Sequence, residues 1–260
     1  MCQFFLLHVH WDHLLLLGQE FVLKKKIFLP SHNYTGDDPN YNRLVFLQAE
    51  DEVLSGNIPI DTDEDALKLS TMSVSIALGD EFPDTAAGLC ERIDSGSELI
   101  LDYVPPDYRS KKSAIDWSEI VFKSATDSYG NHSIDDMQNE FVEIISKSPL
   151  YGTHWFFVYR HRNGTAPQVV SLPEKLILGF NAEGLHIFDT DLKFIRSFEY
   201  EKIYRWGGSA SQFCIILFDS NLEESFDLVV ITTQASDMAS IIIDHIEFLL
   251  AEKEFLKNNI

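Results

Sequence analysis

The chain has 260 residues, a formal net charge of −21 and 45% hydrophobic residues. That length suits one large domain or two ordinary ones, with enough apolar residues to form real cores. The acidic balance argues against a nucleic-acid partner, because the sequence has no basic stripe that could neutralise phosphates. Cys2, Cys90 and Cys214 are far apart and odd in number. They fit buried or incidental thiols in a reducing compartment better than a disulfide framework.

The negative charge is unevenly distributed along the chain. Residues 37–102 hold sixteen acidic side chains against three basic ones, whereas residues 151–260 hold fifteen against nine. We interpret the acidic surface as a solvated face, with a cation-binding role as the alternative.

The first 23 residues contain a histidine-rich stretch. His8, His10, Asp12 and His13 follow an apolar run and read H-x-H-x-D-H. The stretch resembles the zinc signature of the metallo-β-lactamase superfamily, in which a metal-bound water is the nucleophile. Only seven residues precede it, and no later histidine lies in a matching glycine-rich loop. We therefore prefer a trimmed or irregular N-terminus, and keep a metal-dependent hydrolase as the alternative.

Residues 24–149 are expected to form a helical bundle after an edge strand at residues 27–30. Asp37-Asp38-Pro39 is a strong helix start, and Ser55-Gly56-Asn57 ends that helix. A second helix is predicted from the acidic cap at residues 61–64 to Gly79. Residues 82–96 are expected to be irregular. A last helix is predicted over residues 133–147, with a serine cap and one apolar side.

Residues 151–257 show a different pattern, which is a series of short β-type segments separated by turn signals. After Thr233 the apolar period becomes helical. About seven strands and one long amphipathic helix predict a two-sheet sandwich closed by that helix, the plan of a pleckstrin-homology or phosphotyrosine-binding (PTB) fold. The strands are predicted at residues 155–159, 175–181, 185–189, 194–198, 203–206, 213–219 and 225–232.

Taken in order, these pieces resemble the second and third lobes of a FERM domain, most closely those of talin heads and of unconventional myosin tails. The match runs over about 230 residues. It is carried by KKKIF at 24–28, LQAEDEVLSGNIP at 47–59, DALKL at 65–69, LGD at 78–80, YVP at 103–105, YGTHWFFV at 151–158, LGFNAEGL at 178–185, IYRW at 203–206 and TTQ at 232–234.

The resemblance implies an α+β chain of two lobes. Residues 24–149 would be a helical, acyl-CoA-binding-protein-like second lobe, and residues 150–258 a PH/PTB-like third lobe. Residues 1–23 would be a remnant of, or linker from, a missing ubiquitin-like lobe. We expect the chain to be a fragment, a shortened gene model or a stand-alone two-lobe protein.

The resemblance also implies binding rather than catalysis, without a cofactor. FERM third lobes take peptides from the cytoplasmic tails of membrane proteins or cargo, often of the Asn-Pro-x-Tyr type, along the fifth strand and the closing helix. Carried over by position, Arg205 and Trp206 are the expected peptide contacts, and Ile203 and Tyr204 supply strand hydrogen bonds and packing. The alternative is that Trp206 only packs at a strand end.

Talin-type FERM heads also meet acidic phospholipids through basic patches, and they connect receptors to the actin cytoskeleton. The resemblance therefore implies a cytoplasmic location at the cytoskeleton and the inner face of the plasma membrane, or a cargo-binding myosin tail. Two short basic clusters predict weak lipid binding at best, because the acidic second lobe opposes them. These clusters are Lys24, Lys25 and Lys26, and Arg109, Lys111 and Lys112.

Overall fold

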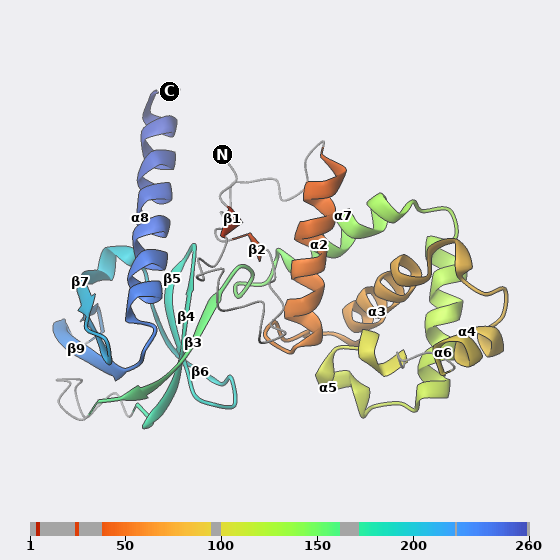
Figure 1. Cartoon of the computed structure of the whole chain (residues 1–260), viewed down its shortest axis with the longest axis horizontal. Helices are drawn as coiled ribbons and strands as arrows, with labels where there is room; N and C mark the ends of the chain where they lie inside the picture. The colour runs from red at the N-terminus through yellow and green to blue at the C-terminus, as the bar shows by residue number, and fades with distance from the viewer. Residues whose placement is uncertain are drawn as a thin grey trace, which may run out of the picture. The chain divides into compact units, whose positions relative to one another are not determined.

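The computed structural model describes residues 4–5, 24–25, 38–94, 100–161, 172–221 and 223–258 (Figure 1). The chain divides into two compact units. A helical unit ends at Tyr151, and a β unit begins at Gly152. The predicted edge strand at residues 27–30 lies outside the described residues.

The helical unit contains a small antiparallel pair of strands and a set of packed helices. The strands are β1 (Phe4–Phe5) and β2 (Lys24–Lys25). The helices are α2 (Pro39–Leu54), α3 (Asp63–Leu78), η1 (Gly79–Glu81), α4 (Ala86–Asp94), η2 (Ile100–Tyr103), α5 (Pro106–Arg109), α6 (Ala114–Ser124), η3 (Ala125–Tyr129) and α7 (Ile134–Ile145).

Side-chain caps fix where these helices begin. Asp38 accepts a hydrogen bond from the Asn40 amide at 2.9 Å, directly before the proline that opens α2. Ser133 and Asp136 form a reciprocal capping box at the start of α7. Each box satisfies amides that a helix terminus otherwise leaves unpaired. The predicted helices at α2, α3 and α7 are confirmed within a few residues.

One expectation for this unit was wrong, and one helix was not predicted. The expectation of an irregular segment fails for Ala86–Asp94, which form α4, with Thr85 accepting a hydrogen bond from the Gly88 amide at 3.0 Å. The helix α6 was not predicted, although Ser113 and Asp116 form a capping box at its start. Glycine and proline dominate the sequence around α4 and led to the expectation of an irregular segment. The capping signal at the start of α6 was not recognised in the sequence.

The helical core lies between α2, α3, α6 and α7. Phe46 and Phe141 meet edge to face at 5.1 Å between ring centroids, and both are buried. Trp117 of α6 is also buried, in a cluster with Leu89 and Val121. Burial of side chains of this size supplies most of the stabilisation of such a unit.

The β unit has the seven strands and the long closing helix that the sequence predicts, and its strands are joined into one antiparallel sheet instead of two separate sheets. The strand order is β6-β5-β4-β3-β9-β8-β7, and β3 joins the two halves of the sheet because it pairs with β4 and, at its end, with β9. The elements are β3 (His154–Arg160), β4 (Lys175–Asn181), β5 (Gly184–Phe188), β6 (Phe194–Phe198), η4 (Tyr200–Lys202), β7 (Ile203–Gly208), β8 (Gln212–Asp219), β9 (Glu224–Ile231) and α8 (Ala235–Asn258).

Alternating strand residues and one side of α8 share a single apolar core. Phe180, Phe213, Phe226 and Ile242 are among its buried members. The period of two in the strands and of 3.6 in the helix places these side chains on facing surfaces. The helix therefore closes the sheet, as the sequence pattern predicts.

A buried polar network ties the β4–β5 turn to the rest of the unit. The Asn181 amide donates to the Thr153 hydroxyl at 3.1 Å, and its oxygen faces His186 Nε2 at 2.9 Å. The Tyr200 hydroxyl donates to the Asn181 carbonyl at 2.7 Å. Burial lowers the pKa of His186, so the neutral imidazole is favoured as the donor to Asn181.

We expect Asn181→Ala to destabilise the β unit by roughly 2–4 kcal/mol, because it leaves buried polar groups of Thr153 and His186 without their partner. Denaturant unfolding of the purified chain measures this change. Asn221→Ala is the control, since Asn221 is exposed in the β8–β9 turn of the same unit. Equal stability of the two variants would contradict the role assigned to the network.

Candidate functional site

The candidate site is the edge of the sheet formed by β7. Among the described strands β7 pairs only with β8, so its other side carries backbone groups without a strand partner. An edge of this kind accepts an added strand through main-chain hydrogen bonds.

A bulge at the start of β7 sets which side chains point outward. Ile203 pairs with Leu217 and Arg205 with Ile216, so Tyr204 is an extra residue on this strand. Bulges re-aim the side chains next to them. As a result, Tyr204 and Arg205 are both exposed.

The helix α8 contacts β7. At one end, a Cβ built on Gly208 would lie 2.7 Å from the Ala235 Cβ, so the two backbones approach closely. At the other end, Lys253 forms an ion pair with Glu201 at 2.9 Å. The helical distance between these contacts is about 27 Å and the strand distance is at most about 23 Å. Strand and helix therefore run side by side in opposite directions.

The side of α8 that faces β7 is apolar. Ala235 and Lys253 are separated by about five full helical turns, so both lie on the same side of the helix. Ala239 and Ile246 recur on this side at helical spacing and pack against the buried core. Slightly farther round the helix, Ile243 and Leu250 are 44% and 56% exposed. These four side chains, which we call the α8 wall, are Ala239, Ile243, Ile246 and Leu250.

The four residues predicted for peptide binding lie together on β7 but differ in exposure. Ile203 is buried in the core, and Trp206 is half-buried against it. Tyr204 is 59% exposed and stacks on Phe218 at 5.8 Å. Arg205 is exposed and makes no hydrogen bond or ion pair within the described part of the chain. Tyr204, Arg205 and Trp206 thus keep side-chain surface at the edge, whereas Ile203 does not.

Sequence reasoning placed the strand end too early and missed the α8 wall. The strand continues through Gly207 and Gly208 instead of turning there. Space beside Gly207 is open, since a Cβ built there would meet nothing within 4 Å. The exposed Ile243 and Leu250 are seven residues apart on a helix, and that spacing beside the core stripe was the available signal.

The charges at the ends of this edge are mixed. The hydrogen bond from Lys253 lowers the pKa of Glu201, and the same contact raises the pKa of Lys253. Both side chains are mostly exposed, so the pair is screened by solvent. It marks where the helix end meets the strand start and adds little to stability.

Much of the second predicted basic cluster is engaged within the helical unit. The Arg109 guanidinium donates to the Val104 carbonyl at 2.9 Å and to the Leu54 carbonyl at 3.1 Å. Lys111 pairs with Asp63 at 2.9 Å and lies over the Tyr108 ring at 3.7 Å. These contacts leave Lys112 as the member of the cluster with no such contact in the described structure.

The other predicted sites lie largely outside the described residues. Lys24 and Lys25 form β2, whereas Lys26 and the stretch with His8, His10, Asp12 and His13 are not described. The described residues contain no group of three or more side chains that could hold a metal ion. Among the described helices, none has the length and apolarity needed to cross a membrane.

Comparison with known families identifies the class to which this architecture belongs. Residues 31–156 match the FERM central domain, and residues 159–250 match the PTB domain of IRS-1 type. The chain therefore combines a FERM central lobe with a PTB-like lobe, as the sequence resemblance indicated. These are the second and third lobes of a FERM module.

The curated relatives are long proteins of which this chain matches a part. It is 24% identical to Talin-B of Dictyostelium discoideum over 234 residues, which is 90% of this chain and 8% of that protein. It is 28% identical to the Kinesin-like protein KIN-14I of rice over 195 residues, or 75% of this chain and 15% of the relative.

Solved structures with the same fold come from myosins and merlin. The C-terminal MyTH4-FERM domain of human Myosin 7b, in complex with the harmonin-a PDZ3 domain, superposes with a TM-score of 0.65 at 18% identity. The match covers 88% of this chain and 43% of that one. The FERM domain of Drosophila Merlin superposes with a TM-score of 0.63 at 18% identity. This match covers 89% of this chain and 72% of that one. At these low identities, the structural likeness shows the fold alone.

We expect Arg109→Ala to destabilise the helical unit by about 2 kcal/mol, because two carbonyl groups lose a charged donor. Lys112→Ala removes the same charge without such contacts and is the matched control. Thermal and urea unfolding distinguish the two. A loss of stability that is no greater for Arg109→Ala than for Lys112→Ala would show that the contacts of Arg109 do not stabilise the helical unit.

Proposed function

We propose that the chain is a non-catalytic binding module whose β unit captures an extended peptide along β7, beside α8. The carrying observation is the unpaired edge of β7 together with the contact between β7 and α8, a helix on which Ile243 and Leu250 are exposed. The ligands we propose are cytoplasmic tail peptides of membrane proteins or cargo.

The backbone of such a peptide would extend the sheet. A strand added to β7 pairs its main-chain groups with those on the open side of the edge, which gives affinity without dependence on sequence. Open space at Gly207 leaves room for a ligand backbone at this end. The ligand would lie between an edge strand and a helix.

Side chains would then supply selectivity. Alternate residues of a strand point to the same side, so every second peptide residue would face α8. Ile243 and Leu250 offer apolar contacts there, and Trp206 offers an aromatic surface at the sheet edge. Arg205 adds a charged donor for a peptide carbonyl or carboxylate. The groove therefore favours a peptide with apolar residues at alternate positions.

In cells, we propose that this capture links membrane proteins to the cytoskeleton in the cytoplasm. The relationship to talins supports this role. The second candidate is a cargo-binding part of a motor protein, and both the rice kinesin relative and the myosin structures favour it. Contact with acidic phospholipids would be weak, since Arg109 and Lys111 are engaged internally.

Ile243→Ala should weaken binding of a tail peptide of Asn-Pro-x-Tyr type about tenfold, because a truncated central contact typically costs more than 1 kcal/mol. Ile231→Ala is the matched control, since Ile231 on β9 is also 44% exposed but lies away from β7. Isothermal titration with labelled synthetic peptides measures both affinities, and thermal melts report folding.

Trp206→Ala is expected to weaken peptide binding at least as much, and also to lower stability because the ring packs against the core. The two Ile variants therefore give the cleaner comparison. Equal peptide affinity for Ile243→Ala and Ile231→Ala, with both variants folded, would show that the α8 wall is not part of the binding site.

A further inference from the structure

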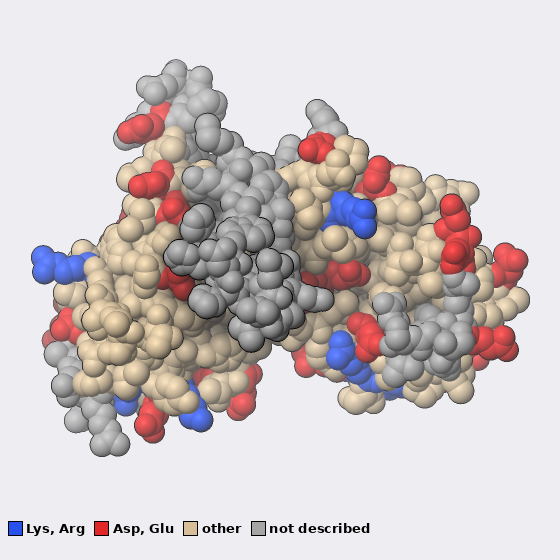
Figure 2. All heavy atoms as spheres, viewed as in Figure 1, with Lys and Arg blue, Asp and Glu red and all other residues tan. Residues whose placement is uncertain are grey.

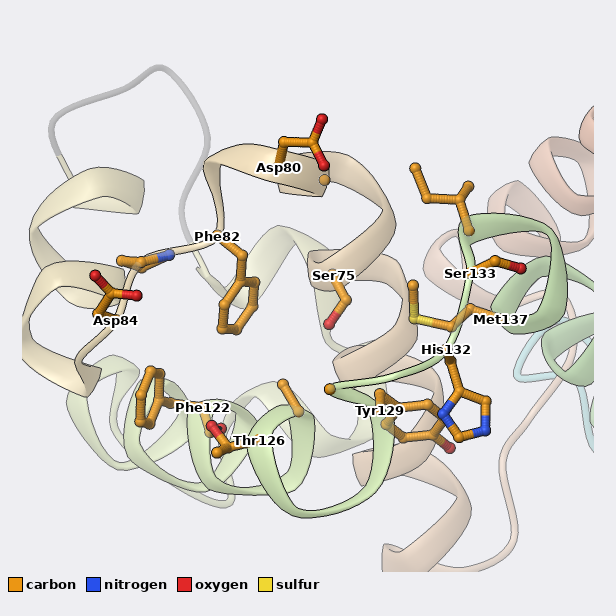
Figure 3. A pocket seen from close by; sticks show the side chains of 15 residues that line it. Ser75, Asp80, Phe82, Asp84, Phe122, Thr126, Tyr129, His132, Ser133 and Met137 are labelled. Carbon is orange, nitrogen blue, oxygen red and sulfur yellow. Dashed lines mark hydrogen bonds between the residues drawn. The ribbon is translucent and has the colours of Figure 1, made fainter.

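The helical unit contains a cavity that the proposed peptide groove does not involve. It has a volume of about 560 Å³ and opens between the end of α3, the turn after it, the α6–η3 helix and the start of α7 (Figure 3). Ligand pockets typically measure about 300–1,000 Å³, so the space suits a small organic group.

Aromatic and apolar side chains form the interior of this cavity. The rings of Phe82 and Phe122 are stacked at 6.1 Å with an interplanar angle of 16°. They come from the turn after α3 and from α6, and both point toward the cavity (Figure 3). Ala125 and Met137 are buried among its lining residues. Such a lining accepts a flat apolar group.

The helix that forms one wall changes its winding at the cavity. Residues Ala125–Tyr129 form a π-helical turn directly after α6. Single π turns inside α-helices are rare and occur frequently at functional sites. Ala125, Thr126 and Tyr129 of this turn line the cavity.

A buried hydroxyl without a partner also belongs to a lining residue. Ser75 lines the cavity, and its Oγ atom is shielded from solvent and has no hydrogen-bond partner in the described structure. An unpaired buried polar atom costs free energy. A ligand donor within reach of Ser75 would remove that cost.

The charged groups at the mouth have one sign. Asp80 and Asp84 line the cavity and are exposed, whereas its lining contains no Lys or Arg. Neither carboxylate forms an ion pair within the described residues. Carboxylates also spread over the visible face of the helical unit as a whole, where basic side chains form only small groups (Figure 2). Such a field attracts cations.

We propose that this cavity binds an organic cation with an aromatic stem. The stem would stack on Phe82 and Phe122, and the ammonium or guanidinium group would lie at the mouth, in the field of the exposed Asp80 and Asp84 carboxylates. Cations also gain energy over aromatic faces. The group can belong to a small amine or to a basic residue beside an aromatic one in a peptide.

Three probes of similar shape and different charge test this proposal. They are tryptamine, neutral 3-methylindole and anionic indole-3-propionate, titrated into the full chain and followed by backbone NMR shifts. We expect tryptamine to bind about tenfold tighter than the other two, with shifts around the cavity. N-acetyl-Trp-Lys-amide and N-acetyl-Trp-Glu-amide form the peptide arm, and tighter binding of the lysine peptide than of tryptamine identifies a peptide as the source.

Two double variants separate local from global charge effects. Asp80→Asn with Asp84→Asn should remove the preference for tryptamine, about a tenfold loss. Asp61→Asn with Asp107→Asn removes the same charge from exposed positions outside the cavity and should change affinity less than about twofold. Thr126→Trp, at an exposed lining position, should block all three probes.

The proposal is overturned if tryptamine does not bind, if the three probes bind equally, or if the control variant loses as much affinity as the Asp80 and Asp84 variant. Shifts confined to the β unit would also overturn it. Peptide binding along β7 is measured separately and can fail or succeed independently of these results.

Discussion

The close side-by-side packing of β7 and α8 is the constraint on which the candidate function depends. Gly208 permits it at one end, because any side chain there would collide with Ala235. The ion pair between Glu201 and Lys253 marks the other end. Since the sheet order leaves β7 unpaired on one side, this arrangement keeps a free edge beside an apolar helix surface. A side chain at position 208 would force the helix and strand apart.

Two polar features of the structure differ in how their groups are satisfied. In the β unit, Asn181 joins Thr153, His186 and Tyr200 into a network that fixes the β4–β5 turn. In the helical unit, Ser75 lines a cavity, and its buried Oγ atom has no hydrogen-bond partner in the described structure. Buried polar groups are normally paired, and satisfied networks hold a framework. Ser75 is the member of the unpaired set that lines the cavity, which is why it helps to mark this cavity as a candidate site.

Much of the fold was readable from the sequence because local signals agreed with the tertiary structure. Alternating strands, the helical period after Thr233 and caps such as Asp38 and Ser133 each specify an element without long-range information. The helix α4 was missed because Pro83 and Gly88 dominate its pattern, although Thr85 caps it. Local composition can conceal a helix that packing stabilises.

The candidate site was only partly readable. The β7 residues could be named from the resemblance, but the outward position of both Tyr204 and Arg205 follows from a bulge that is defined by pairing with β8. Which exposed residues of α8 lie on the side toward β7 depends on the register of the helix along the strand. The cavity beside the π turn has no sequence motif, because segments from Ser75 to Met137 build it together.

The central claim is that a peptide becomes an added strand on β7, and amide hydrogen exchange tests it most directly. Exchange of individual amides is measured by NMR in the free chain and with a bound peptide of Asn-Pro-x-Tyr type. The account predicts slower exchange for amides on the open side of residues 203–208 and shifts on α8 at Ile243 and Leu250. Peptide binding that leaves the exchange of every β7 amide unchanged would contradict it.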